Sequence, residues 1–215
     1  MNFNYLEREP GSGGVPKQLV VFLHGYGSNG ADLISLAPEF YQVLPDAHFV
    51  SPDAPYPFEG GLYGAFQWYG FADRSDAGML NNAKSVEGEL NGFIDRQLAR
   101  FKLKDKDLIV MGFSQGAMMA IHNVYRRPHK AKAVVSFSGF MAGLREFKKE
   151  VKSKPPILIT HGTNDTIVPF KALDIMVNTL TQLDIKVTEH VSEGLGHGID
   201  AECIEAAQKF LSALV

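Results

Sequence analysis

Short apolar runs alternate with longer helical patterns along nearly the whole chain, and this alternation limits the possible folds more than any other feature. Six runs have the composition of strands, most of them buried on both faces: 19–23, 47–50, 108–111, 133–137, 157–160 and 185–191. The clearest helix candidate extends from about 79 to 101, where apolar residues recur at helical spacing. The alternation predicts an α/β fold with a mainly parallel central sheet and helices on both faces.

The chain has the size and composition of one folded unit. Its 215 residues, 45% of them hydrophobic, are enough for one substantial core, and no linker or repeat divides them. We therefore expect residues 1–215 to form a single domain. The glycine-rich stretch 11–14 is interpreted as a hairpin connection or a frayed entry, and the cationic stretch 148–154 as a solvated helix end.

Charge and hydropathy exclude several classes of partner. Lys and Arg number 21 against 24 Asp and Glu, so no basic excess exists to attract nucleic acid. The chain shows neither a secretory signal pattern nor an apolar stretch long enough to span a bilayer, which favours a cytoplasmic location. The single cysteine, Cys203, agrees with a reducing compartment. A monomer and a homodimer both remain open.

The segment 112–116, GFSQG, fits the pattern G-x-S-x-G, in which a sharp turn from a strand to a helix exposes a serine hydroxyl. The apolar run 108–111 leads directly into it, and the apolar helical segment 117–121 follows. This context is the one that the motif requires. It predicts Ser114 to be a nucleophile and not an ordinary turn serine.

A serine hydroxyl needs a histidine as base, and the histidine needs a carboxylate to orient it. Asp165 follows the strand candidate 157–160, and His197 lies among glycines after the last strand candidate, so the order is Ser, Asp, His. The ordinary alternatives are a turn or cap aspartate and a loop histidine. We expect His161 to form a local hydrogen bond beneath the Asp165 loop. No histidine or cysteine pattern indicates a metal, and we expect no cofactor.

An oxyanion hole requires two backbone donors that point at the developing negative charge. The residue after the nucleophile, Gln115, is expected to supply one amide, and Tyr26, in the loop after the strand candidate 19–23, is expected to supply the other.

The same early loop offers a rival interpretation. Residues 25–30, GYGSNG, match G-x-G-x-x-G after a strand and before a helix, as in a dinucleotide-binding unit, and Asp46 and Asp53 lie near the distance of a ribose ligand. That hypothesis leaves Ser114, Asp165 and His197 without a role. A non-catalytic binding protein on a hydrolase scaffold is a third hypothesis.

These motifs resemble the phospholipase/carboxylesterase family of small α/β-hydrolases, which includes acyl-protein thioesterases and lysophospholipases. The similar segments span most of the chain: LHGYG at 23–27, SPDAP at 51–55, WY at 68–69, GFSQG at 112–116, HGTNDTIVP at 161–169 and GH at 196–197. The resemblance implies an α/β-hydrolase fold and an ester or thioester substrate, cleaved without metal or cofactor. Many family members have an aspartate where this chain has Gly70, which is a departure beside the expected substrate groove.

The interval from Ser114 to Asp165 leaves no room for a separate cap domain, so loops must contact the substrate. The densest aromatic segment is 56–71, and the family resemblance singles out Trp68 and Tyr69 within it as an acyl wall. The sequence does not distinguish among a protein thioester, a lysophospholipid and a small ester as the physiological substrate, and it does not give the preferred acyl length.

Overall fold

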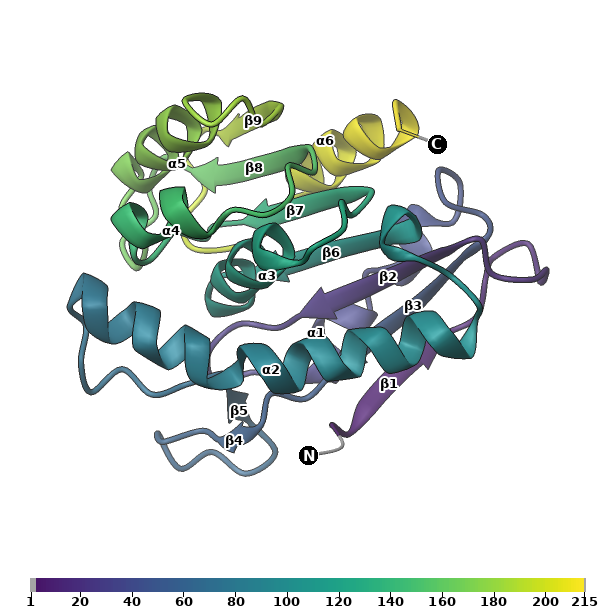
Figure 1. Ribbon diagram of the computed structural model, residues 1–215, viewed down its shortest axis with the longest axis horizontal. Coiled ribbons are helices and arrows are strands. Elements are labelled where there is room, and N and C mark those ends of the chain that lie inside the picture. The colour runs from purple at the N-terminus through teal and green to yellow at the C-terminus, as the bar shows by residue number, and fades with distance from the viewer. Residues whose placement is uncertain (1–2, 215) are drawn as a thin grey trace.

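A twisted sheet of seven strands forms the centre of the computed structural model, which describes residues 3–214 (Figure 1). The strand order is β1-β3-β2-β6-β7-β8-β9. The strands are β1 (Tyr5–Arg8), β2 (Gln18–Leu23), β3 (Ala47–Pro52), β6 (Leu108–Phe113), β7 (Ala133–Phe137), β8 (Ile157–Gly162) and β9 (Val187–Ser192). All neighbours are parallel except β1, which pairs antiparallel with β3. The predicted mainly parallel sheet is confirmed.

The first strand is the element that the sequence pattern missed. β1 has an exposed, polar character, and its partner β3 separates it from β2 in the sheet. The turn at 11–14 therefore joins two strands that are not neighbours, and its interpretation as a hairpin connection was wrong.

Helices cover both faces of the sheet. They are α1 (Gly30–Ile34), α2 (Asp76–Arg100), α3 (Gln115–Arg126), α4 (Leu144–Glu150), α5 (Lys171–Thr181) and α6 (Ala201–Ser212), with 3-10 turns η1 (Ala37–Phe40) and η2 (Asp105–Asp107). One core packs α2, α3, α4 and α5 on the front face in Figure 1, and a second packs α1 and α6 on the back. Successive residues of β2 point to opposite faces of the sheet, so Val21 packs in the first core and Val20 in the second.

The longest helix, α2, begins earlier than its apolar stripe predicts. The Ser75 side chain accepts a hydrogen bond from the backbone N–H of Gly78 at 3.1 Å, which caps the helix before the first buried apolar residue, Met79. No helix within residues 3–214 has the length and apolarity needed to cross a bilayer.

A short hairpin, β4 (Tyr56–Pro57) and β5 (Phe66–Gln67), projects from the chain after β3. It is bonded to the loop after β2, because the Gly27 N–H donates to the Phe66 carbonyl at 2.9 Å and the Phe66 N–H donates to the Ser28 carbonyl at 2.7 Å. The hairpin is therefore fixed next to the carboxyl end of β2, where the site lies.

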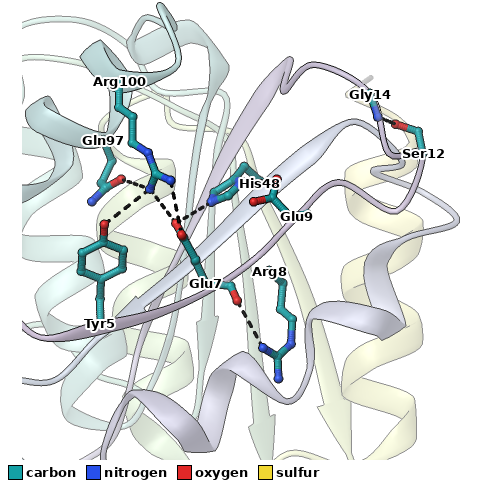
Figure 2. Close-up of polar contacts among 9 residues, drawn as sticks. All are labelled: Tyr5, Glu7, Arg8, Glu9, Ser12, Gly14, His48, Gln97 and Arg100. Carbon is teal, nitrogen blue, oxygen red and sulfur yellow. Dashed lines mark hydrogen bonds and ion pairs between the residues drawn. The ribbon is translucent and has the colours of Figure 1, made fainter.

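Glu7 fastens β1 to the rest of the molecule (Figure 2). Its carboxylate accepts hydrogen bonds from Arg100, at the end of α2, at 2.6 Å and from the buried ring of His48, on β3, at 3.0 Å. The bond from Arg100 is the main cause that lowers the pKa of Glu7, and the His48 bond adds to it against the opposing effect of burial.

We expect Glu7→Gln to lower stability at neutral pH by about 1 kcal/mol, and Tm by about 2–4 °C, because a partly exposed charged hydrogen-bond network is lost. Since folding depresses the pKa of Glu7, its stabilisation is present above the unfolded pKa and is lost as pH falls through the folded one. Thermal unfolding of both proteins from pH 7 to pH 3 should therefore show the difference shrinking. A difference that persists at pH 3 would contradict this account.

Candidate active site

Ser114 occupies a sharp turn between β6 and α3, with φ 53° and ψ −117°. A non-glycine residue rarely adopts a positive φ, and such strain costs about 1–3 kcal/mol unless the surroundings enforce it. Two close approaches enforce it here. A Cβ on Gly112 would lie 2.4 Å from the Gly116 carbonyl carbon, and a Cβ on Gly116 would lie 1.9 Å from the Leu23 carbonyl oxygen. Both glycines of G-x-S-x-G are therefore required sterically.

Three side chains predicted from the sequence lie together at this turn. The distance from His197 Nε2 to Ser114 Oγ is 2.9 Å, and that from His197 Nδ1 to Asp165 Oδ2 is 2.7 Å. With Nδ1 protonated and donating to the carboxylate, Nε2 of a neutral imidazole is free to accept from the serine hydroxyl. The arrangement has the geometry of a nucleophile, a base and an orienting carboxylate.

The Asp165 carboxylate is fully buried, and each oxygen has donors. Oδ1 accepts from the backbone N–H groups of Ile167 at 2.9 Å and Val168 at 2.8 Å, and Oδ2 accepts from His197. A buried carboxylate needs this number of donors to remain charged. Asp165 thus stabilises the turn in which it lies, as expected of a turn or cap aspartate, and it also binds His197.

His161 lies directly beneath this turn, as the sequence analysis expected. Its Nε2–H donates to the Val168 carbonyl at 2.9 Å, and the same nitrogen is 3.4 Å from Asp165 Oδ2. The ring is fully buried and supports the turn from below.

The loops that carry Asp165 and His197 are bonded to each other. The Asn164 N–H donates to the Leu195 carbonyl at 2.9 Å, and the Thr163 N–H donates to the Ser192 carbonyl at 3.1 Å. Asp200 then caps α6 by accepting from the Cys203 N–H at 2.8 Å. The histidine loop is therefore held at both ends.

Two backbone N–H groups face the same edge of the sheet. Tyr26 follows β2 and Gln115 begins α3, and β2 and β6 are parallel neighbours with Leu23 opposite Gly112. Neither N–H of Tyr26 or Gln115 donates to any residue within 3–214. These are the two amides that the sequence analysis selected as oxyanion donors.

His24 fixes the peptide before Tyr26, a role that the sequence analysis did not assign. Its Nδ1–H donates to the Gly25 carbonyl at 2.8 Å, while Nε2 accepts from the Ala54 N–H at 2.9 Å. Burial is the main cause that lowers the pKa of His24, against the opposing effect of the Gly25 bond. The ring therefore stays neutral, as its two bonds require. Its position directly after an apolar strand was the available signal.

Trp68 and Tyr69, the expected acyl wall, are both buried in the core, so neither presents an open surface to a substrate in this structure. Trp68 is 0% exposed and Tyr69 is 3% exposed. The Trp68 indole N–H donates to the His24 carbonyl at 2.9 Å. The Gln115 side-chain amide accepts from the Trp68 N–H at 2.9 Å and donates to the Tyr69 carbonyl at 2.8 Å. Trp68 and Tyr69 thus support the backbone that surrounds the site.

The Tyr26 side chain holds the other side of the aromatic segment. Its hydroxyl donates to Glu59, and burial together with this carboxylate raises the pKa of Tyr26 to about 12. A Cβ at Gly70 would lie 2.8 Å from Glu59 Oε2. Glu59 therefore places a carboxylate beside the position where the resembling family carries an aspartate.

The G-x-G-x-x-G segment does not present its backbone to a ligand as a dinucleotide site would. Within 25–30, the N–H groups of Gly27, Ser28 and Gly30 donate to Phe66, Gly25 and Asp53 respectively. A pyrophosphate needs such groups to be free. A Cβ at Gly30 would also lie 2.3 Å from the Ser51 carbonyl oxygen, so this glycine is required for packing.

The sheet, the Ser114 turn and the three aligned side chains define an α/β-hydrolase fold with an esterase-type site. Residues 12–215 match the model of a protein family described as phospholipase/carboxylesterase, and the chain belongs to this family. It is accordingly a hydrolase of the esterase and thioesterase class.

The chain is similar to several named proteins of this class, one of which is named as probably inactive. Acyl-protein thioesterase 1 of Saccharomyces cerevisiae is 28% identical over 214 residues, which cover 91% of this chain and 92% of the yeast protein. A probable inactive carboxylesterase of Oryza sativa subsp. japonica is 26% identical and covers 96% and 89% respectively. The crystal structure of esterase PE8 superposes with a TM-score of 0.94 at 34% identity over 100% of both chains.

We expect Trp68→Phe to lower kcat about 5- to 100-fold with little change in KM, because the His24 carbonyl is left buried and unpaired, which costs about 1–3 kcal/mol and loosens the His24–Gly25 peptide next to the one that carries the Tyr26 N–H. The loss should be equal for acetyl and longer acyl esters. The matched control is Tyr125→Phe. It removes a buried hydroxyl near the end of α3 that donates to the Pro155 carbonyl, away from the candidate site. A loss confined to long acyl chains would show instead that Trp68 contacts the substrate.

Proposed function

We propose that the protein cleaves carboxylic esters or thioesters by a Ser-His-Asp mechanism with an acyl-enzyme intermediate. The observation that carries the proposal is the continuous contact from Ser114 Oγ to His197 Nε2 and from His197 Nδ1 to Asp165 Oδ2, at 2.9 and 2.7 Å. It is supported by the strained backbone of Ser114, which presents the hydroxyl at the edge of the sheet.

In the proposed acylation step, His197 Nε2 takes the proton of Ser114 as Oγ bonds to the acyl carbon. The carbon–oxygen or carbon–sulfur bond to the leaving group then breaks, and His197 passes the proton to the departing alcohol or thiol. A water molecule attacks the acyl-enzyme by the same route, which releases the acid and restores Ser114.

The free N–H groups of Tyr26 and Gln115 would stabilise the oxyanion in both steps. Preorganised donors of this kind contribute about 2.7–4 kcal/mol each in related chemistry. Asp165 would hold the His197 tautomer and stabilise the imidazolium as it forms, and its complete burial makes that interaction stronger than it would be in water.

The substrate is proposed to be an acyl ester or acyl thioester. The match to the phospholipase/carboxylesterase family supports this class, as do the names of the yeast thioesterase and of esterase PE8. The non-catalytic hypothesis gains no support from the site, since all three side chains are present and aligned.

Ser114→Ala should remain folded and lose about three to six orders of magnitude in kcat, because the nucleophile is removed. The measurement is hydrolysis of 4-nitrophenyl butyrate, together with labelling of the wild-type protein by a fluorophosphonate and identification of the modified peptide. Ser85→Ala, on the exposed face of α2, is the matched control and should keep full activity. Near-wild-type turnover by Ser114→Ala, or labelling at another residue, would remove Ser114 from the mechanism.

Acyl-chain length should affect kcat/KM in a graded way. Each buried methylene adds about 0.8 kcal/mol of binding, so the rate should rise from acetyl to medium-chain esters. With no cap domain to enclose a long chain, the gain should then level off. The test is a panel of esters, and a separate panel of thioesters, with two to sixteen acyl carbons. Within each panel the leaving group is the same, so that only the acyl length varies. A steady rise to the longest chain would show a closed acyl tunnel.

A further inference from the structure

A pocket lies directly beside the base of the site, between α1 and the loop that follows His197. Its volume is about 330 Å³. His197 and Phe113 form one end, and the Phe113 ring packs against the imidazole at a centroid distance of 4.9 Å. The remaining walls combine apolar and polar groups and include one carboxylate: Leu33, Leu36, Ile199, Ser35, Gly198 and Asp32.

The chemistry of the proposed function determines which part of the substrate such a pocket receives. His197 must hand a proton to the leaving group, so the leaving group has to lie next to the imidazole when the bond to the acyl carbon breaks. The pocket is bounded by His197, so an alcohol or thiol that lies next to the imidazole can extend into it.

Asp32 gives this pocket a negative charge. One of its carboxylate oxygens accepts from the Ser28 hydroxyl at 2.7 Å, and the other has no hydrogen-bond or ion-pair partner within residues 3–214. The side chain is exposed at the first turn of α1. An available carboxylate in a pocket that also has leucine, isoleucine and phenylalanine walls favours a cation with an apolar body.

The surroundings extend the same charge pattern. Past Leu36 and Ile199 the pocket adjoins a second one of about 380 Å³, which Glu39, Asp200 and Glu205 border. No lysine or arginine lines either pocket within the part of the chain that the structure describes. The two pockets together form one groove, which extends from His197 along α6. The carboxylates in its lining are not balanced by a lysine or arginine of the same lining.

We propose that this groove is the leaving-group subsite and that Asp32 selects alcohols or thiols that carry a positive charge. The inference rests on the proposed hydrolase function and adds a substrate class to it. The bond changes are those of acylation: Ser114 Oγ bonds to the acyl carbon, the bond to the cationic alcohol breaks, and the alcohol leaves with the proton from His197.

Two butyryl esters of matched shape test the proposal: butyrylcholine and its uncharged isostere, 3,3-dimethylbutyl butyrate. At low ionic strength we expect kcat/KM to be about two- to fivefold higher for the choline ester, the size of one exposed charge interaction. Asp32→Asn keeps a hydrogen-bond acceptor for Ser28 and should lower the ratio of the two rates about two- to fivefold, which separates the effect of the charge from the different intrinsic reactivity of the two esters. Added salt should reduce the wild-type ratio in the same direction.

Asp174→Asn is the matched control, because it removes an exposed carboxylate from α5 on the opposite face of the sheet. It should leave the wild-type ratio unchanged.

Equal rates for the two esters in the wild type would overturn the inference, and so would an unchanged ratio in Asp32→Asn. If 4-nitrophenyl butyrate is not hydrolysed and Ser114 is not labelled by fluorophosphonate, the proposed function itself fails. Labelling together with equal ester rates removes only the leaving-group assignment.

Discussion

The first turn of α3 lies against the carboxyl end of β2 so closely that no side chain fits between them. At Gly116 a single added carbon would lie 1.9 Å from the Leu23 carbonyl oxygen. This contact fixes the height of Ser114 above the sheet and forces its positive φ. It also brings the amide that begins α3 next to the loop after β2. The proposed nucleophile and both proposed oxyanion donors thus depend on one backbone contact.

Burial of a carboxylate sets the second requirement. Asp165 is removed from water and is compensated by two backbone donors and one ring nitrogen, which also fix the turn in a single conformation. The backbone bonds between this turn and the histidine loop then leave His197 little freedom to rotate away from Ser114. Stability and alignment of the site have the same source.

The sequence predicts those strands and candidate site residues whose signal lies in a few consecutive residues. Most of the predicted strands are buried on both faces, β9 being the exposed exception, and the order of Ser114, Asp165 and His197 depends only on which loops follow which strands. β1 was missed because its exposed residues lack an apolar pattern and its pairing with β3 is a long-range contact. Trp68 was misplaced because an aromatic residue in a loop has the same local signature whether it contacts a ligand or, as here, donates to the His24 carbonyl from within the core.

The side chains of Tyr26 and Gln115 hold the aromatic segment 56–71, through Glu59 on one side and through the Trp68 and Tyr69 backbone on the other. The segment is thus bonded to the same two residues whose N–H groups are the proposed oxyanion donors. A molecule that displaces this segment would therefore shift Tyr26 and Gln115 together. Binding at the aromatic segment and the positions of the two proposed oxyanion donors are in this way coupled.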